Sequence, residues 1–439
     1  MRGSVDAKRA SLAAAITAAG FALTVYIFYP GVMTFDARYV YEDIAKGSFG
    51  DWQSPVMTLV WSWIDPIAPG SGSLFLLTAA LYWLAFGLLA VTIARRSMGL
   101  ALLLPILTLS PPAFVFVGIL WRDVLFAAIW LLAAAIALAA ADGAGKIRVP
   151  AQILALALVA FGVLLRPNAI LAAPVLATYV LWPSFFSFKR VAILFLPIAL
   201  GSYGLVHVVY YDLLGAKQQH PLHSIMVFDL GGISHFAGSN VFPGTWSPEE
   251  TKLITDGCYK PVGWDIYWTY TACKFVMARL EPEENIFGTP RLVGAWKDAI
   301  ISHPLAYLRH RTAFMWTFLT GANLTMWTID VNDTSKIALA DNPRLMALKQ
   351  FHDVLKPTPL FRAGTWLIFD LILCLFAWRL RDRPMGDFVV AICGSAVVYT
   401  TTFFAVGVAT DFRYALLAVL AALAGAVALV QTVMNRHAC

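Results

Sequence analysis

The sequence contains few charged residues for its length. Of its 439 residues, 13% are charged and 59% are hydrophobic, and the mean hydropathy is +0.71. Domains that fold in water carry about a quarter charged residues and roughly half apolar ones. This composition excludes a soluble globular protein and predicts a polytopic membrane protein. The net charge of +6 follows from the membrane topology described below, so we expect no nucleic-acid partner.

Motifs of cofactor-dependent enzymes are also missing. The chain contains no Walker-type phosphate loop and no dinucleotide fingerprint. It has no compact cluster of His and Asp residues with the spacing of metal ligands. We therefore expect no nucleotide and no metal site built from such a cluster.

Long apolar runs dominate what is present. The basic N-terminus leads into the first run, which is long for a signal peptide and is followed by Tyr29-Pro30-Gly31 instead of a small-residue cleavage site. We expect this run to be retained as a span, the alternative being a cleaved signal peptide. The sequence predicts an all-α protein with about ten transmembrane helices, at roughly 10–29, 73–94, 99–118, 124–141, 151–165, 169–186, 191–210, 362–378, 387–409 and 414–433.

Lysine and arginine lie in alternate connections between these runs. Because positive residues favour the cytoplasmic side, we place both termini and the connections 95–98, 142–150, 187–190 and 379–386 in the cytoplasm. The acidic residues in these segments are Asp6, Asp142, Asp382 and Asp387. The more numerous basic residues are Arg2, Lys8, Arg9, Arg95, Arg96, Lys146, Arg148, Lys189, Arg190, Arg379, Arg381, Arg383 and Arg436. The other connections then face the outside.

The predicted topology divides the chain into three regions. Residues 1–210 form an N-terminal transmembrane module of seven helices, with a first outer loop at 30–72. Residues 211–361 form an extracytoplasmic cap with a helical stretch near 290–311, and residues 362–439 supply the last three helices.

An apolar stretch at 312–327 raises the count to eleven if it also spans the membrane. A span there moves residues 379–383 outside, against the charge rule. We therefore predict an interfacial or re-entrant helix over roughly 306–327, with Arg309 and Arg311 at the lipid headgroups.

The five cysteines separate by predicted side of the membrane. Cys258 and Cys273 lie in the outer segment, Cys374 and Cys393 in apolar helices, and Cys439 in the cytoplasmic tail. Oxidising conditions outside favour a Cys258–Cys273 disulfide, which contributes about 3 kcal/mol in the chain-entropy model. The alternative is two free thiols.

Ionisable residues gather at the predicted outer ends of the helices. A charge deep in a bilayer costs about 2.5–3.5 kcal/mol, so such charges usually pair or line a wet cavity. An interfacial charge costs little and can simply cap a turn, which is our interpretation of Glu42, Asp51 and Asp65. For Asp36, Asp123 and Arg413 we expect a shared cavity instead, on the condition that the outer helix ends that carry them meet.

Carboxylates and arginines together indicate a kind of substrate. A carboxylate can act as a general base or as a metal ligand, and a guanidinium group binds phosphate through two parallel hydrogen bonds. At the depth of the headgroups, this combination suits a lipid-linked phosphate.

Several short motifs along the chain resemble those of a known family. The resemblance is to the GT-C-type integral membrane glycosyltransferases of bacteria, relatives of lipid-A aminoarabinose transferase and protein O-mannosyltransferase. The matching motifs are spread over most of the chain and follow one another in the same order as in the family. The residues that carry it are Tyr29-Pro30-Gly31, Asp36, Gly47, Asp51-Trp52-Gln53-Ser54-Pro55, Trp121-Arg122-Asp123, Arg166-Pro167-Asn168, His303-Pro304-Leu305-Ala306-Tyr307-Leu308 and Asp411-Phe412-Arg413-Tyr414.

The resemblance implies an enzyme of the bacterial inner (plasma) membrane, with its active site on the periplasmic side. Such an enzyme moves a sugar from a polyprenyl-phosphate donor to an extracytoplasmic acceptor at the bilayer surface. The resemblance also implies that Asp36 is the base and that Asp123 supports the site. Donor phosphate then binds Arg413, with Arg166 and Arg122 as further candidates. Asp51, Gln53 and Tyr414 are candidates for substrate binding. The family varies in metal dependence, so a divalent cation stays open as a cofactor.

This chain departs from the family pattern in the first outer loop. Relatives often have Asp-Trp-His-Pro where this chain has Asp51-Trp52-Gln53-Ser54-Pro55. Gln53 cannot titrate as His does, which argues against an acid–base or metal role there. Arg122 stands where Lys is frequent, and the positive charge is kept.

Three other functions compete with this interpretation. A transporter or flippase usually has an internal repeat and more charges within its spans, where Asp370 is the clear example here. A polysaccharide polymerase or ligase uses the same lipid-linked substrates with a different architecture. A non-catalytic assembly protein is the third alternative.

Overall fold

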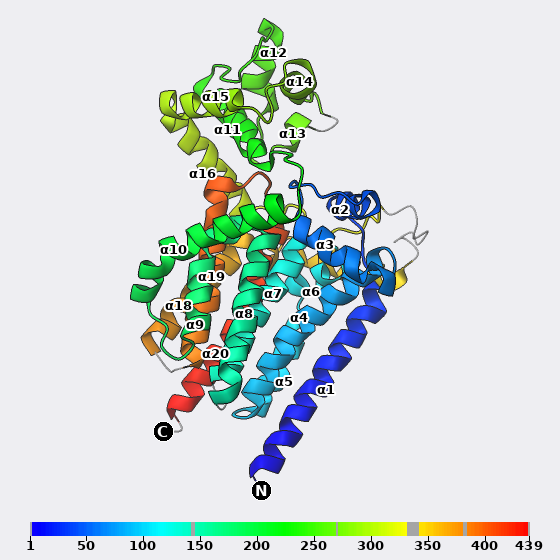
Figure 1. Ribbon diagram of the computed structural model, residues 1–439, viewed down its shortest axis with the longest axis vertical. Helices are drawn as coiled ribbons and strands as arrows, with labels where there is room; N and C mark the ends of the chain where they lie inside the picture. The colour runs from blue at the N-terminus through cyan, green and yellow to red at the C-terminus, as the bar shows by residue number, and fades with distance from the viewer. Residues whose placement is uncertain (1, 142–144, 269–270, 332–341, 381–383, 438–439) are drawn as a thin grey trace.

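The computed structural model of the protein describes residues 2–141, 145–268, 271–331, 342–380 and 384–437 (Figure 1). Over these residues the protein is built from helices, with four isolated β-bridges and no strand. This confirms the prediction of an all-α polytopic membrane protein. The residues Asp142, Arg381, Asp382, Arg383 and Cys439, which entered the topology and cysteine predictions, lie outside the described residues.

Eight helices in the described part of the chain are long and apolar enough to cross a membrane. Because a span needs about twenty mainly apolar residues, short amphipathic helices do not qualify. The eight are α1 (Arg2–Phe28), α4 (Ser71–Ala94), α7 (Arg122–Ala141), α8 (Gly145–Leu165), α10 (Phe188–His207, continued by the π-helix Val208–Leu213), α18 (Ala363–Leu380), α19 (Met385–Val406) and α20 (Leu416–His437).

Two of the ten expected spans are not single long helices. The run at 99–118 is split into α5 (Met98–Thr108) and α6 (Pro111–Val117), which meet at an angle of 61°. The break falls at Pro111 and Pro112, because proline removes a backbone donor and clashes with the preceding turn. If this bent pair crosses the membrane as one unit, the candidate spans number nine.

Prolines also shorten the run expected at 169–186. It begins with a 3-10 helix (Pro167–Leu171), continues as α9 (Ala173–Leu181) and ends before Pro183. With nine residues, α9 is about half the length that crosses a bilayer. It is nevertheless buried, and it packs against α8, α10 and α19.

The long helices form a bundle with both chain termini at one end (Figure 1). We call the opposite end, where α2 and α3 lie, the outer end. Helices α7 and α20 occupy the core of the bundle, whereas α10 is mostly uncovered and presents apolar side chains as a lipid-facing helix does. Close packing in the core uses glycine: a Cβ at Gly162 would lie 2.1 Å from Nε1 of Trp130, which agrees with the use of small residues where membrane helices touch.

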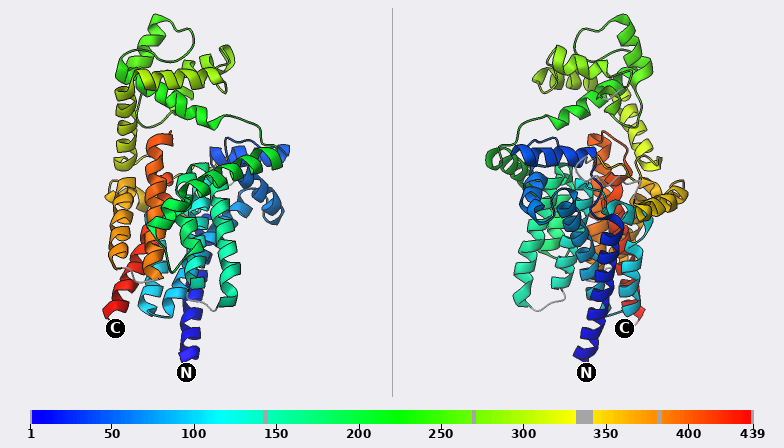
Figure 2. Two further views of the ribbon diagram at one scale, coloured as in Figure 1. Left: turned by 60° about the vertical axis from the view of Figure 1, so that its left-hand side comes forward. Right: turned by 90° about the vertical axis from the view of Figure 1, so that its right-hand side faces the viewer.

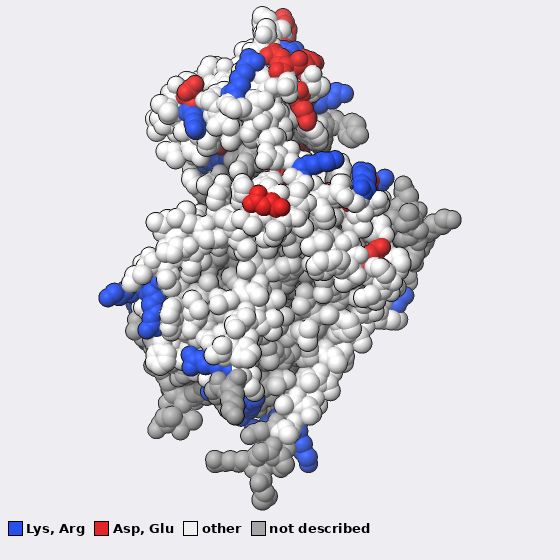
Figure 3. Space-filling model, viewed as in Figure 1, with Lys and Arg blue, Asp and Glu red and all other residues white. Residues whose placement is uncertain are grey.

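The charged side chains are distributed unequally between the two ends. On the face drawn in Figure 3, acidic side chains are visible only toward the outer end and above it, whereas the lower half shows Lys and Arg alone. The sequence places Arg95, Arg96, Lys189 and Arg190 in connections between the long helices. This asymmetry is what the predicted topology requires.

The first outer loop is largely helical. It contains α2 (Phe35–Lys46), α3 (Pro55–Ile64) and a 3-10 turn (Asp65–Ile67). Thr34 caps α2 by accepting a hydrogen bond from the backbone N–H of Ala37, at 3.2 Å. Helix α2 ends at Gly47, whose φ of 58° is a conformation that favours glycine.

The cap stands above the outer end of the bundle (Figure 2). It comprises α11 (Pro221–Ala237), α12 (Pro248–Leu253), α13 (Asp265–Trp268), α14 (Phe275–Ala278) and α15 (Pro290–Ser302). The chain contains the Cys258–Cys273 disulfide that the sequence favoured, in the interior of the cap. Helix α16 (Pro304–Thr320) leads back to the bundle, followed by α17 (Pro343–Leu355) and the 3-10 turn Pro359–Phe361.

The prediction that Arg311 lies at the headgroups is wrong. Arg309 is exposed, but the Arg311 side chain is fully buried and forms an ion pair with Asp229 at 2.7 Å. Arg311 also donates a hydrogen bond to the backbone oxygen of Gly407, at the end of α19. A buried guanidinium group needs a partner, and this partner is 82 positions away on α11. Arg311 therefore fastens the cap to the bundle. Helix α16 itself is not among the helices that qualify as spans.

Candidate functional site

Five of the predicted site residues come together at the outer end of the bundle. Asp36 lies in the first turn of α2, and Arg122 and Asp123 begin α7. Arg166 follows α8, and Arg413 lies in the 3-10 turn (Phe412–Ala415) that leads into α20. The convergence expected from the topology is therefore found.

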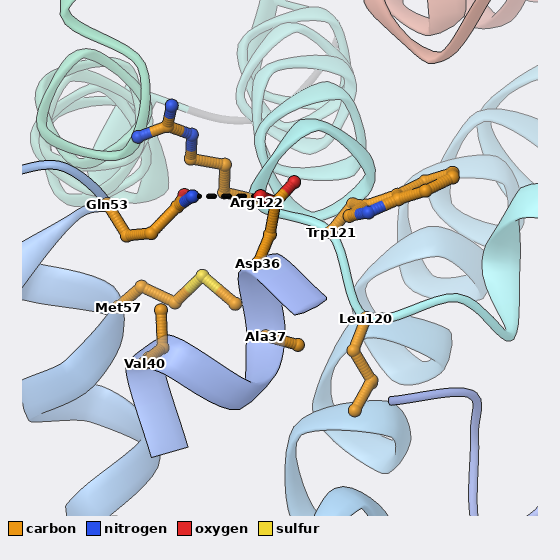
Figure 4. Close-up of a pocket in the computed structure, with 8 residues that line it drawn as sticks. All are labelled: Asp36, Ala37, Val40, Gln53, Met57, Leu120, Trp121 and Arg122. Carbon is orange, nitrogen blue, oxygen red and sulfur yellow. Dashed lines mark hydrogen bonds between the residues drawn. The ribbon is translucent and has the colours of Figure 1, made fainter. Parts of the chain in front are cut away.

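Asp36 is held by two side chains from other elements. One carboxylate oxygen forms an ion pair with Arg413 at 2.6 Å, and the other accepts a hydrogen bond from the Gln53 amide at 3.2 Å. Figure 4 shows the Asp36 carboxylate directed toward Gln53, with Arg122 and Trp121 nearby. Because 38% of the Asp36 side chain remains exposed, it can be reached from outside.

Arg413 is the centre of the cluster. In addition to Asp36, it forms an ion pair with Asp411 at 3.2 Å and donates a hydrogen bond to the Tyr414 hydroxyl at 3.2 Å. Its guanidinium carbon lies 4.5 Å from the centre of the Trp121 ring, within cation–π range. These contacts fix the planar group in one orientation.

A second ion pair lies deeper in the bundle. Arg166 contacts Asp123 at 2.7 Å, and both side chains are more than nine-tenths buried. Arg166 also donates a hydrogen bond to the Tyr399 hydroxyl at 3.2 Å and lies 5.0 Å from the Tyr414 ring centre. Tyr414 thus touches both arginines and connects the deep pair to the outer one.

Arg122 differs from the other two arginines. It donates a hydrogen bond to the backbone oxygen of Trp52 at 3.4 Å. Among the described residues, no carboxylate lies within ion-pair distance of it. Its charge is therefore open to an anionic ligand.

The electrostatic surroundings set the protonation of the outer carboxylates. Burial alone raises the pKa of Asp36, but the charge and hydrogen bond of Arg413 outweigh it, with Arg122 and Arg166 in support, so the pKa of Asp36 lies below its usual value. Burial raises the pKa of Asp411 to about 6, against the attraction of Arg413 and with repulsion from Asp265 and Asp36. Asp36 is therefore ionised at neutral pH.

A small cavity lies beside Asp36 (Figure 4). Its lining is Asp36, Ala37, Val40, Gln53, Met57, Leu120, Trp121 and Arg122, and its volume is about 10 Å³. This is room for about one water molecule. A ligand the size of a sugar phosphate therefore enters only if side chains move. Of the three residues expected to share a cavity, Asp36 lines this one, whereas Asp123 and Arg413 do not.

Asp51 lies away from the ion pairs. One of its oxygens accepts a hydrogen bond from the backbone N–H of Gln219 at 2.6 Å, and the other accepts one from the Tyr211 hydroxyl at 2.8 Å. Both contacts tie the first outer loop to the segment after α10. Substrate binding by Asp51 stays a prediction, as do the roles of Gln53 and Tyr414.

Within the described ranges, no group of three or more His, Cys, Asp or Glu side chains could hold a metal ion. The acids of the cluster are paired with arginines instead, and three guanidinium groups suit an anion. These residues do not fit a divalent cation.

Sequence reasoning missed part of the site. It noted Asp411 without a role, and it did not single out Tyr399, which contacts Arg166, or Asp265 of the cap. The signal for Asp411 was its place two residues before Arg413. Asp265 gave no signal, because it lies in the cap, and no local pattern specifies how the cap packs on the outer end of the bundle.

No protein-family model, curated protein or solved structure matches this sequence. The functional conclusion therefore rests on the chemistry of the cluster at the outer end.

Proposed function

We propose that this protein is a GT-C-type membrane glycosyltransferase. It transfers a sugar from a polyprenyl-phosphate donor to an acceptor hydroxyl or amine on a glycolipid, polysaccharide or protein. Asp36 acts as the base, and the site opens to the extracytoplasmic side of a bacterial inner membrane.

The observation that carries this proposal is the convergence of Asp36, Arg413 and the Asp123–Arg166 pair at one end of a bundle of membrane helices. Arginine binds phosphate bidentately and stays charged. A helix bundle gives a polyprenyl chain an apolar surface beside that phosphate. A donor with a lipid tail and a phosphate head matches both features.

In the proposed reaction, Asp36 accepts the proton of the acceptor hydroxyl or amine. The acceptor atom then forms a bond to the anomeric carbon, and the bond between that carbon and the phosphate oxygen breaks. Polyprenyl phosphate leaves with the electron pair. Arg413, assisted by Arg122 and Arg166, stabilises the charge that grows on it. No nucleotide is needed, since the donor carries its own leaving group.

The Asp36–Arg413 pair gives donor binding a second effect. A donor phosphate that binds Arg413 competes with the Asp36 carboxylate for the same N–H groups. Asp411 keeps one contact to Arg413 during this exchange. Donor binding thereby releases Asp36 toward the acceptor. This accounts for a cavity that is too small for the sugar before the donor binds.

Purified protein in nanodiscs tests the proposal. Wild type and Arg413→Ala are given a panel of polyprenyl-phosphate sugars, and sugar release or transfer is measured together with donor binding. We expect turnover of at least one donor by wild type and a loss of about 100-fold or more in Arg413→Ala. Movement of intact donor across a bilayer without cleavage would favour a flippase, and neither binding nor turnover of any donor would refute the proposal.

A further inference from the structure

Three tryptophans form a row that leads from the cap to the catalytic cluster. The ring of Trp264 lies 5.6 Å from that of Trp52 and stacks on that of Trp268 at 6.1 Å, measured between ring centres. Trp264, in the middle, is 6% exposed, whereas Trp268, at the far end, is 50% exposed. Half of a large aromatic side chain is thus left in water although burial is favourable.

The row is fixed to the bundle by backbone contacts. The N–H of Trp264 donates a hydrogen bond to Val408 at 2.9 Å, and the N–H of Thr410 donates one to Val262 at 3.0 Å. The segment from 408 to 410 leads directly to Asp411 and Arg413. The position of the cap tryptophans is therefore set by the same segment that carries the site arginine.

The inner end of the row touches the site itself. Trp52 precedes Gln53, which donates to Asp36, and the backbone oxygen of Trp52 accepts a hydrogen bond from Arg122. Asp265, between Trp264 and Trp268 in sequence, has its pKa raised by burial and by the charge of Asp36. Asp265 is the first residue of α13 and directly follows Trp264, so the tryptophan row carries one carboxylate.

An interfacial belt does not explain this row. Belt tryptophans lie on the lipid-facing surface at the ends of the spans, but Trp264 and Trp268 belong to the cap. Figure 1 shows α13 on the side of the cap above α2. Sugar rings expose C–H groups on their faces and hydroxyls at their edges. Aromatic faces pack against the C–H groups, and a carboxylate accepts hydrogen bonds from the hydroxyls.

We propose that Trp52, Trp264 and Trp268, together with Asp265, form a subsite that binds a carbohydrate acceptor and directs one of its hydroxyls toward Asp36. The subsite rests on the proposed function only in naming the bound sugar as the acceptor. Its affinity for carbohydrate is independent of donor chemistry. Among the acceptor classes named above, it favours a glycolipid or polysaccharide over a bare polypeptide.

The test combines binding and kinetics in full-length protein. Intrinsic tryptophan fluorescence is titrated with mannobiose, galactobiose, glucobiose and arabinobiose. Donor hydrolysis, with water as acceptor, is followed in the same samples. The variants are Trp268→Ala, Trp268→Phe and Asp265→Asn. Trp316→Ala is the matched control, since Trp316 is 69% exposed on α16 and lies outside the row.

We expect saturable binding of at least one disaccharide by wild type and by Trp316→Ala. Loss of the ring in Trp268→Ala should weaken binding by about tenfold, with partial rescue in Trp268→Phe, while donor hydrolysis is unchanged in Trp316→Ala. No disaccharide binding by wild type, or equal affinity in Trp268→Ala, would overturn the subsite while donor hydrolysis still stands. Disaccharide binding without any donor hydrolysis would instead count against the proposed reaction and leave the subsite intact.

Discussion

Replacing Asp36 by Asn should separate donor binding from turnover. Asn keeps the shape of the side chain but removes the charge that holds Arg413. The ion pair spans 2.6 Å, with 38% of Asp36 and 12% of Arg413 exposed. Because Asp36 is more than a third exposed, solvent screens the ion pair, and we take its stabilising free energy to be about 1 kcal/mol. If a donor phosphate must displace Asp36 from Arg413, Asp36→Asn should therefore bind donor about fivefold more tightly.

The assay is equilibrium binding of a polyprenyl-phosphate sugar to protein in nanodiscs, by native mass spectrometry or fluorescence. Glu42→Gln is the matched control. Glu42 lies on the same helix as Asp36 and pairs with Arg38 on an exposed surface, so its loss should leave the dissociation constant unchanged. Weaker donor binding in Asp36→Asn than in wild type would refute the competition for Arg413.

Three further predictions concern stability. Asp123→Ala leaves the buried Arg166 without its carboxylate and should lower the free energy of unfolding by about 3–5 kcal/mol, seen as a lower Tm in detergent; an unchanged Tm would contradict this. The pKa of Asp411 is about 6 against a usual 3.8, so the folded protein binds a proton there that the unfolded chain does not. Stability should thus fall by up to about 3 kcal/mol as pH rises from about 4 to about 6; Asp411→Asn should flatten this part of the Tm–pH profile, and an equal slope would refute it. Finally, Cys258→Ser with Cys273→Ser opens a loop with a sequence separation of 15 and should destabilise the cap by about 3 kcal/mol; unaltered hydrogen exchange in the cap would argue against it.

The membrane class of the fold could be predicted from composition and apolar run length, because a bilayer restricts spanning segments to a few structures. The number of spans could not be predicted as well. Pro111 and Pro112 break one apolar run, and Pro167 and Pro183 shorten another. Hydropathy counts apolar residues in a window and does not register where a proline ends a helix.

The site was predictable where it depended on topology alone. Asp36 and Arg413 are 377 positions apart, yet both follow from placing their helix ends on one side of the membrane. Arg311 was mispredicted because its partner, Asp229, lies on a different helix of the cap. Such a pairing depends on how two helices pack, and no local pattern specifies that. The packing of Trp264 against Trp52 could not be predicted for the same reason.

Sugar release by wild type and Asp36→Asn, measured side by side at saturating polyprenyl-phosphate sugar, tests the central claim most directly. Saturation removes any difference in donor affinity, so the comparison reports the chemical step. We predict that Asp36→Asn is slower by about 100- to 10,000-fold while its Tm stays close to that of wild type. Equal rates in the two proteins would contradict the assignment of Asp36 as the base.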